Sequence, residues 1–307
     1  MGKNFIDIKD FSKEDIIEIL NRAKELKHLN KPKNVNLGLL KDKNIYFLFF
    51  EPSTRTKMSF LKAASLLGAT TFDFETSKSS LNKGESLIET LVNLESLGAD
   101  AFIIRVKEVG FFDILKNKIK ASLINAGEGT YRHPSQALLD LYTLWEEYDY
   151  DFEKLKNLKI TIIGDIKNSR VARSLLKLFS LFEIKTFIYG PSTYLLENPE
   201  VYNTEILNSL EKALNISDVI ILLRIQLERQ NAKKYFPSLK TYNYFYGLSL
   251  EKIKNIKKNI KIMHPGPFNE GVEINSELAY SNCSLIFKQV NNGVFVRAAI
   301  LEKLLKI

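Results

Sequence analysis

The feature that most constrains the fold is the alternation of short apolar runs with amphipathic segments along the chain. Short apolar runs bounded by turn residues predict strands, and apolar residues recurring every three or four positions predict helices. The predicted strands span 44–50, 70–74, 100–105, 121–125, 158–164, 185–189, 218–223 and 260–263. The first predicted helix begins at Ser12. Further helices are predicted at 57–67, 85–97, 110–117, 136–148, 169–181, 204–214, 249–257 and 293–305. Such alternation is typical of parallel sheets covered by helices.

The length predicts two domains, because 307 residues exceed what one ordinary hydrophobic core serves. A polar stretch at 146–151 separates the first series of strands from the second. The predicted fold class is therefore α/β, with two doubly wound parallel-sheet domains joined by interdomain helices. Ligands are expected at the carboxyl ends of the strands and in the cleft between the halves.

Composition and charge narrow the class of protein. Hydrophobic residues make up 45% and charged residues 26% of the chain, as in ordinary globular proteins. No apolar run is long enough to span a membrane, no apolar signal segment follows the first residues, and the single Cys283 excludes an intramolecular disulfide. We expect a cytoplasmic protein. The lysines behind the net charge of +8 are dispersed over helix surfaces rather than concentrated in a tail, and small anionic substrates explain the positive sign as well as nucleic acid does. No nucleic-acid partner is expected.

A cluster of hydrogen-bond donors lies where the chain passes from the strand at 44–50 into the next helix. A helix N-terminus presents unpaired N–H groups and the positive end of its dipole, so it attracts anions. An arginine there can hold a phosphate with two parallel hydrogen bonds. A single serine would indicate only a helix cap. Four consecutive donors favour a phosphate site, formed by Ser53, Thr54, Arg55 and Thr56.

Three more polar residues of the first half allow two interpretations each. Lys83 follows a serine-rich loop and could neutralise a phosphate, although such a lysine is more often a surface residue. Arg105 closes a strand at the edge where parallel sheets bind ligands, and a simple charge at a strand end explains it equally well. His133 lies in a glycine-rich turn, where it could polarise a carbonyl or have no chemical task.

The second half places arginines at strand exits. Arg170 follows the strand at 158–164 and Arg224 follows the strand at 218–223, which together favour a site for a dicarboxylate. The stiff bend around Pro265 and Gly266 can present backbone carbonyls to a ligand. The chain has no Walker-type loop, no dinucleotide fingerprint and no persuasive metal-ligand spacing, so no cofactor and no metal are expected.

These segments together resemble the aspartate/ornithine carbamoyltransferase family over nearly the whole chain. The motifs that resemble those shared across the family are Ser53-Thr54-Arg55-Thr56 and His133-Pro134-Ser135-Gln136. The segments 169–174, 223–229 and 264–267 resemble the aspartate enzymes of the family. Ornithine enzymes would show His-Cys-Leu-Pro and Ser-Met-Gly segments, and neither occurs.

The resemblance implies that carbamoyl phosphate and L-aspartate react to give N-carbamoyl-L-aspartate and phosphate, an early step of pyrimidine synthesis. The implied phosphate-binding residues are Ser53, Thr54, Arg55, Thr56 and Arg105. Thr56, Arg105 and His133 are implied to polarise the carbamoyl oxygen, and Gln136 to orient the carbamoyl amine beside the backbone of Pro265 and Gly266. Aspartate is implied to bind Arg170, Arg224 and Gln226. Because phosphate leaves as a stabilised anion, the reaction needs orientation and fixed positive charge rather than a nucleophilic side chain or a metal.

The resemblance also implies an assembly and a domain division. Residues 1–135, with the C-terminal helix at about 290–307 packed back on them, would bind carbamoyl phosphate, and residues 136–289 would bind aspartate. The family forms homotrimers in which Lys83 and a nearby serine serve a neighbour's site. The spacing to Lys83 favours Ser79 over Ser80. The sequence leaves open whether a regulatory chain or a dihydroorotase partner binds.

Two departures from the family pattern and three alternatives bear on this hypothesis. Lys57 and Glu270 stand where the family has arginine, which puts a forked phosphate grip and local loop contacts in question. A transcarbamoylase for another amine, such as ornithine, would differ in its acceptor. A non-catalytic homologue would lack the phosphate-site residues, which are present here. A polyanion-binding protein rests only on the net charge.

Overall fold

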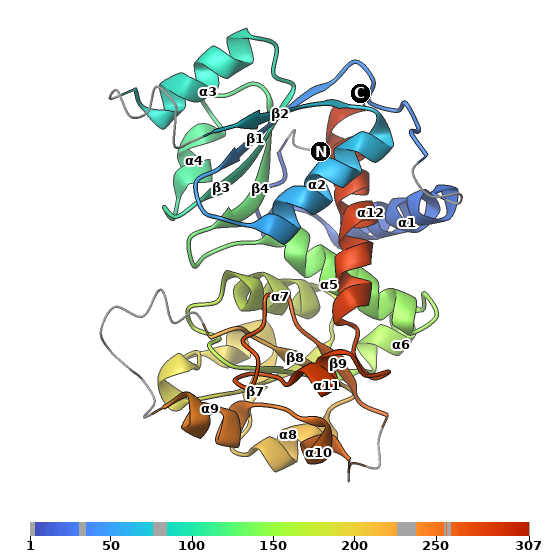
Figure 1. The fold of residues 1–307 in the computed structure, drawn as a ribbon, viewed down its shortest axis with the longest axis vertical. Helices are drawn as coiled ribbons and strands as arrows, with labels where there is room; N and C mark the ends of the chain where they lie inside the picture. The colour runs from blue at the N-terminus through green and yellow to red at the C-terminus, as the bar shows by residue number, and fades with distance from the viewer. Residues whose placement is uncertain are drawn as a thin grey trace. The chain divides into compact units, whose positions relative to one another are not determined.

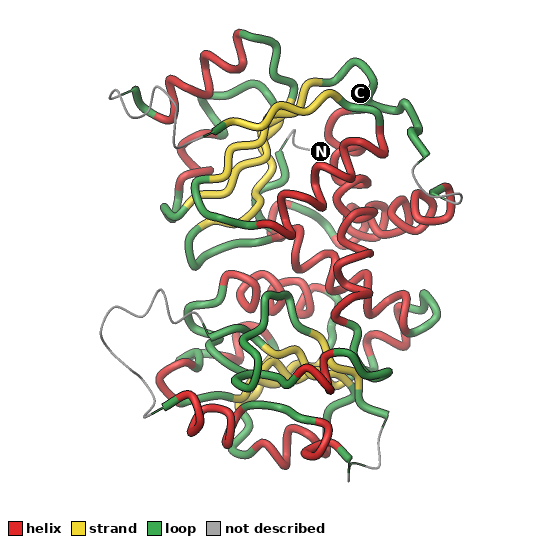
Figure 2. The backbone as a smooth tube through the Cα atoms, in the orientation of Figure 1, coloured by secondary structure: helices red, strands yellow, loops and turns green. Residues whose placement is uncertain are grey.

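The computed structural model describes residues 4–30, 35–75, 85–225, 238–254, 256 and 259–306, and the chain divides into two compact units. Unit 1 comprises Met1–Tyr142 and Val290–Ile307, and unit 2 comprises Thr143–Gln289. Each unit is built on one parallel sheet with helices packed on it (Figure 1, Figure 2). The expected α/β class with two parallel sheets is confirmed.

The sheet of unit 1 has the strand order β2-β1-β3-β4. Its strands are β1 (Asn44–Phe49), β2 (Thr70–Phe74), β3 (Ala101–Val106) and β4 (Ser122–Glu128). Its helices are α1 (Lys13–Leu29), α2 (Thr54–Leu67), α3 (Leu87–Ser96) and α4 (Phe111–Leu115), with most of α5 (Pro134–Glu147) and α12 (Ile286–Leu305). The central strands are buried on both faces, as their continuous apolar runs require. The C-terminal helix α12 packs on α1, where Arg22 Nε donates to Glu302 Oε2 at 2.8 Å.

The sheet of unit 2 has the order β7-β6-β5-β8-β9. Its strands are β5 (Lys159–Ile163), β6 (Lys185–Tyr189), β7 (Thr204–Ile206), β8 (Val219–Leu222) and β9 (Lys261–Met263). Its helices include α6 (Phe152–Lys156), α7 (Arg170–Leu181), α8 (Leu210–Ile216), α9 (Leu239–Tyr246), α10 (Leu250–Ile253) and α11 (Ser276–Ala279). An apolar core that includes Ile163, Ile220 and Ile262 covers the sheet.

The helix predicted at 204–214 is wrong in its first part. Thr204 pairs with Thr186 in the register of β6 and β7, and their buried hydroxyls lie 2.6 Å apart. The helix begins only at Leu210, where the Ser209 hydroxyl accepts a hydrogen bond from Lys212 N. A β-branched start and a serine cap therefore separate a short edge strand from a helix.

Other predicted boundaries shift by a turn or more. Helix α2 begins at Thr54 rather than at 57, and α12 begins at Ile286 rather than at 293. Helix α10 ends at Ile253, before the predicted 257, whereas α9 was not predicted. No helix among the described residues is long and apolar enough to cross a membrane.

Candidate active site

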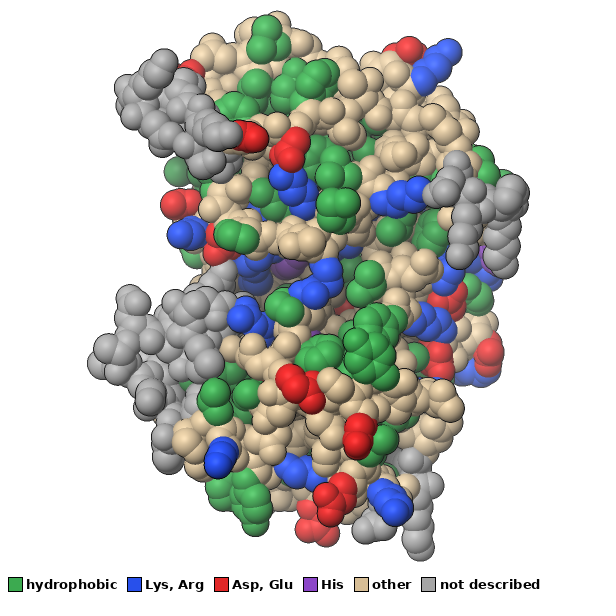
Figure 3. Space-filling view, viewed as in Figure 1, with side chains coloured by type: hydrophobic (Ala, Val, Ile, Leu, Met, Phe, Trp, Pro, Cys, Tyr) green, Lys and Arg blue, Asp and Glu red, His purple; other side chains and the backbone are tan. Residues whose placement is uncertain are grey.

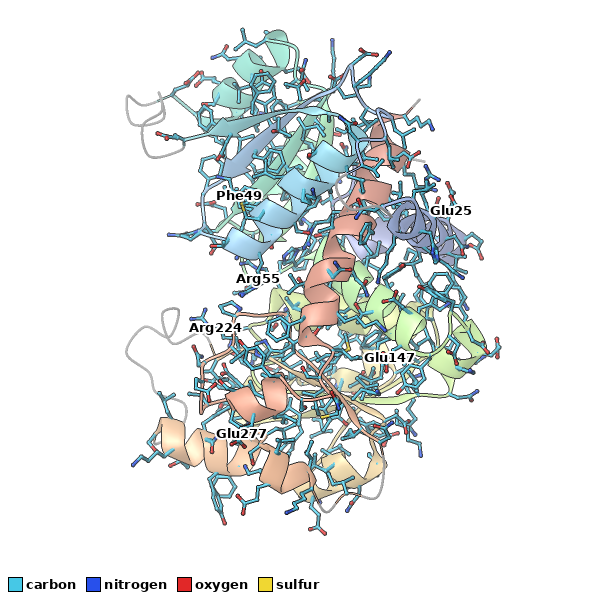
Figure 4. The ribbon with its side chains drawn as sticks, turned by 45° about the vertical axis from the view of Figure 1, so that its right-hand side comes forward. Glu25, Phe49, Arg55, Glu147, Arg224 and Glu277 are labelled. Carbon is cyan, nitrogen blue, oxygen red and sulfur yellow. The ribbon has the colours of Figure 1, made fainter. Side chains whose placement is uncertain are left out.

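The N-terminus of α2 lies directly after β1 and carries the predicted phosphate motif. Ser53 occupies the N-cap position, yet its side chain makes no capping hydrogen bond to the helix. Thr56 is buried, whereas Thr54 and Arg55 are exposed, and Arg55 lies at the start of α2 (Figure 4). The turn therefore presents hydroxyl, guanidinium and backbone N–H donors from one short segment, as an anion site requires.

The sheet register brings Arg105 to the same turn. Arg105 of β3 pairs with Phe49, the last residue of β1, and its carbonyl oxygen accepts a hydrogen bond from Phe50 N at 2.9 Å. Its side chain lies 3.6 Å, Nε to Oε2, from the buried carboxylate of Glu51, and one terminal nitrogen donates to Ala126 O at 3.4 Å. The guanidinium is thus held beside the β1–α2 turn, which confirms its expected place at a strand exit.

His133 and Gln136 enter from the start of α5, just after the exit of β4. His133 is buried, with 4% of its surface exposed, and its carbonyl oxygen accepts from Gln136 N at 3.1 Å. The side chain of Gln136 is also buried, and its Nε2 donates to Asp140 Oδ1 at 2.9 Å. Both residues follow a strand that neighbours β3, so the sheet of unit 1 carries all these groups at its carboxyl edge.

A buried ion network that sequence reasoning missed holds the turn before His133. Arg132 donates to Glu128 Oε2 at 2.5 Å and to Asp113 Oδ2 at 2.7 Å, and lies 3.8 Å from a carboxylate oxygen of Asp7. Burial disfavours the charge of Arg132, but the hydrogen bonds to Glu128 and Asp113 outweigh it and raise its pKa. The network therefore fixes the backbone that leads into His133. Its only sequence signal was the position of Arg132 beside the motif.

Arg297 of α12 is a second buried cation that sequence reasoning missed. Its terminal nitrogen donates to Ser59 Oγ of α2 at 2.8 Å, and its guanidinium lies 5.0 Å from the ring centre of Phe60. Burial lowers the pKa of Arg297 to about 10, against the opposing effect of Asp140. Gly293 makes room for this side chain, because a Cβ there would lie 2.6 Å from the Arg297 guanidinium. Arg297 therefore packs against α2, the helix that carries the phosphate motif, and interacts electrostatically with Asp140 of α5.

Unit 2 presents its own set of polar groups at the carboxyl ends of its strands. Arg170 is the first residue of α7, which Ser169 caps by accepting from Ala172 N at 3.1 Å, and Arg170 is buried. Arg224 follows β8 by two residues and is labelled in Figure 4. Its Nε donates to Asn269 Oδ1 at 3.5 Å.

The loop after β9 is held to the Arg224 segment by a buried carboxylate. Glu273 accepts hydrogen bonds from Ile225 N at 2.6 Å and from Asn269 N at 2.9 Å. Burial raises the pKa of Glu273 against these hydrogen bonds. The same loop contains Pro265 and Gly266, and Gly266 N donates to His264 Nδ1 at 2.8 Å. Hydrogen bonds therefore join the Arg224 segment to Asn269 and Glu273, in the same loop as the Pro265–Gly266 bend.

The two residues that depart from the family pattern, Lys57 and Glu270, each make contacts within their own unit. Lys83, Ser79, Ser80 and Gln226 lie outside the described residues. Lys57 forms an ion pair with Asp73 at 2.6 Å, so its charge is engaged on the side of β2. The Glu270 carboxylate accepts hydrogen bonds from Ser276 N at 2.9 Å and from the Ser276 hydroxyl, and thus stabilises the first residue of α11.

Both units carry basic and acidic side chains on the face drawn in Figure 3. No group of three or more His, Cys, Asp or Glu residues in the described ranges is placed to hold a metal ion.

Comparisons with known proteins give a consistent assignment. Residues 3–146 match the carbamoyl-P binding domain of aspartate/ornithine carbamoyltransferases, and residues 156–304 match their Asp/Orn binding domain. The chain is 43% identical to the aspartate carbamoyltransferase catalytic subunits of Campylobacter hominis and Campylobacter concisus, over 99% of this chain and 97% of each relative.

Solved structures agree with these relatives. The catalytic subunit of M. jannaschii aspartate transcarbamoylase superposes with a TM-score of 0.85 at 34% identity, over 99% of this chain and 98% of that one. The Trypanosoma cruzi aspartate transcarbamoylase, in complex with carbamoyl phosphate and aspartate, gives a TM-score of 0.87 at 27% identity, over 98% and 96%. The resemblance expected from the motifs is thereby confirmed, and the chain belongs to the aspartate/ornithine carbamoyltransferase family.

Proposed function

We propose that this chain transfers the carbamoyl group of carbamoyl phosphate to the amine of L-aspartate, in pyrimidine synthesis. Its full-length similarity to aspartate carbamoyltransferase catalytic subunits supports this activity. The structural observation that carries the proposal is the register of β1 and β3, which sets Arg105 beside the N-terminus of α2. Two sources of positive charge and a row of hydroxyls then face one small anion.

Unit 1 forms the carbamoyl phosphate subsite in this proposal. The phosphate binds the donors of the α2 N-terminus and the guanidinium of Arg105. His133 and Thr56 face the carbamoyl oxygen, and Gln136 faces the carbamoyl amine. The burial of Thr56, His133 and Gln136 supports these roles, because water competes less for hydrogen bonds in a buried site.

The chemical step needs orientation and charge stabilisation. The aspartate amine attacks the carbamoyl carbon, and negative charge grows on the carbamoyl oxygen in the tetrahedral intermediate. Thr56, Arg105 and His133 stabilise that charge. The attacking nitrogen loses a proton, the bond from carbon to the phosphate oxygen breaks, and the electron pair of that bond leaves with phosphate. Donors fixed in advance lower this barrier without a covalent intermediate.

Unit 2 supplies the acceptor subsite. Arg170 and Arg224 bind the two carboxylates of aspartate, together with Gln226. The bend at Pro265 and Gly266 adds backbone contacts. The buried carboxylate of Glu273, which fixes the backbone after Arg224 to Asn269, supports Arg224 as a pre-positioned ligand.

The activity is tested by measuring carbamoyl-aspartate formation, with aspartate and ornithine compared as acceptors. We expect turnover with aspartate alone. The variant His133→Ala should lose about 100- to 1000-fold in kcat, because one donor to the developing oxyanion is gone. Turnover with ornithine alone would establish the other acceptor class. A folded preparation that is inactive with both amines would favour a binding homologue.

We also infer a cytoplasmic homotrimer in which Lys83 and Ser79 complete the site of a neighbouring subunit. Family similarity supports this assembly, and it leaves a regulatory chain or a dihydroorotase partner open. A closed ring with heterologous contacts allows each site to draw on two chains.

Mixing two inactive variants tests the shared site. Lys83→Ala and His133→Ala subunits, dissociated and reassembled together, should recover activity in about a quarter of the sites, because those sites pair an intact His133 with a neighbour's intact Lys83. Each variant reassembled alone is the control. A mixture with no more activity than its components would exclude sharing of these residues.

A further inference from the structure

We propose that Asp140 is a positioning residue that fixes which end of the Gln136 amide meets the donor substrate, and thereby selects an acyl phosphate that carries an amino group. The inference rests on the proposed function, in which Gln136 faces the carbamoyl group. It concerns a residue that the motifs did not single out, and it assigns the choice between a carbamoyl donor and an acetyl donor to one buried contact.

The contact is made within one turn of α5. Gln136 and Asp140 are four residues apart, so their side chains lie on the same face of the helix. Gln136 Nε2 donates to Asp140 Oδ1 at 2.9 Å, Asp140 is fully buried, and only 7% of Gln136 is exposed. An ionised carboxylate accepts hydrogen bonds and donates none. The amide nitrogen of Gln136 must therefore face Asp140, and its Oε1 points the other way.

Arg297 is a buried cation that interacts electrostatically with Asp140. Its guanidinium is buried against α2, through the hydrogen bond to Ser59 and the contact with the Phe60 ring. Asp140 stabilises its charge electrostatically, and the interaction is mutual. A guanidinium stays protonated at neutral pH, so this buried region holds a fixed positive charge. The amide orientation is thus set by two buried groups rather than by the ligand.

The orientation has a chemical consequence for the donor substrate. The carbamoyl group carries an NH2, which donates hydrogen bonds, whereas acetyl phosphate has a methyl group at the same place. Oε1 of Gln136 can accept from the NH2, but it would face the methyl without a partner. Sites built to bond a substrate N–H reject analogues that lack it far more strongly than apolar pockets reject a size change. Asp140 therefore enforces selection for the amino group.

The test compares carbamoyl phosphate with acetyl phosphate as donors to aspartate in the full-length enzyme. In both reactions the amine nitrogen bonds to the acyl carbon and loses a proton, and phosphate leaves with the electron pair of the broken C–O bond. In Asp140→Asn, the new side-chain amide can either donate or accept, so the Gln136 amide can take both orientations. We expect the ratio of kcat/KM for carbamoyl phosphate to kcat/KM for acetyl phosphate to fall about twofold, because two equally populated amide orientations leave half of the sites with Oε1 toward the donor.

Two comparison variants separate positioning from general damage. Asp100→Asn removes a partly buried carboxylate of the same unit, which accepts from Asn44 N at 2.8 Å at the amino end of β1, and should leave the ratio unchanged. Gln136→Glu combined with Asp140→Asn restores an acceptor toward the ligand, since the introduced asparagine amide donates to the introduced carboxylate. This double variant should recover the ratio of the wild type.

The outcomes are distinct. A lowered ratio in Asp140→Asn that the double variant restores supports the inference. Equal losses with both donors in Asp140→Asn, or a double variant that accepts acetyl phosphate freely, would overturn it. A wild-type enzyme that forms no carbamoyl-aspartate would instead overturn the proposed function. The wild-type activity is therefore measured before any variant is compared.

Discussion

The guanidinium of Arg132 is buried beside the buried carboxylates of Glu128 and Asp7. Arg132→Met keeps much of the side-chain volume but leaves those acids without their cation. Breaking a buried ion pair on one side typically costs about 3–5 kcal/mol. We expect a loss of that size in the free energy of unfolding, measured in urea. Lys116→Met, which removes an exposed cation that also pairs with Asp113, should cost less than about 1 kcal/mol.

Arg132 and Arg297 are two residues near the candidate site that could not be identified from the sequence alone. His133 and Arg55 were predicted because a turn before a helix and a helix N-terminus are functional positions in any parallel sheet. Arg132 and Arg297 act from inside the protein, and charged residues are seldom fully buried. Their partners Glu128, Asp7 and Ser59 are distant in the sequence or unremarkable in it, so only the folded chain identifies them.

Glu147, at the C-terminal end of α5, predicts a pH dependence of stability. Burial opposes its ionisation, but ion pairs with Lys261 at 2.7 Å and Lys288 at 2.8 Å outweigh it and lower its pKa. A carboxyl whose folded pKa is depressed contributes stability above its unfolded pKa, and this contribution is lost as the pH falls through the folded value. Glu147→Gln should therefore lower the melting temperature at pH 7, and the gap to wild type should narrow below about pH 4.

The matched control for that titration is Glu251→Gln, which changes an exposed acid of α10 in the same unit. It should leave the melting temperature close to wild type at both pH values. A gap for Glu147→Gln that widens as the pH falls would contradict the sign of the argument.

Helix α9 depends on a C-terminal cap that comes from the next helix. Lys252 Nζ donates to the carbonyl oxygens of Asn243, Tyr244 and Gly247 at 2.7, 2.8 and 2.7 Å. The Asn243 carbonyl also accepts from Gly247 N at 3.0 Å, and carbonyls at a helix end commonly lack intrahelical partners. Lys252→Met should lower the free energy of unfolding by about 1–3 kcal/mol. Lys254→Met, at an exposed position of the same segment, is the control and should change it by less than about 0.5 kcal/mol.

The elements differ in how much of their signal lies in their own sequence, and this decides which of them could be predicted. Strands β1, β3, β5 and β6 were predicted within a residue or two, because a buried parallel strand is a continuous apolar run. Helix α9 has no such internal signal, since its sequence is rich in aromatic residues and its end is fixed by Lys252. Strand β7 is a three-residue edge strand, which depends on its partner β6 more than on its own pattern.

At the scale of the whole molecule, the net charge of +8 is compatible with small-anion binding and with a polyanion partner. Binding of a polyanion and binding of a small anion differ in which cations of the chain take part. A polyanion would engage many dispersed cations and lose affinity steeply with added salt. A small anion needs only the donors at the N-terminus of α2 and Arg105. The dependence of stability on inorganic phosphate therefore distinguishes them.

Phosphate should stabilise the folded chain through that one site. A ligand that binds only the folded state at about 100 times its Kd raises the free energy of unfolding by about 2.7 kcal/mol. We expect the melting temperature to rise with phosphate in the wild type, and the rise to disappear in Arg55→Ala. Lys62→Ala removes an exposed cation two turns further along α2 and should keep the rise. If both variants lost it equally, the effect would come from net charge, and the anion site at the start of α2 would be refuted.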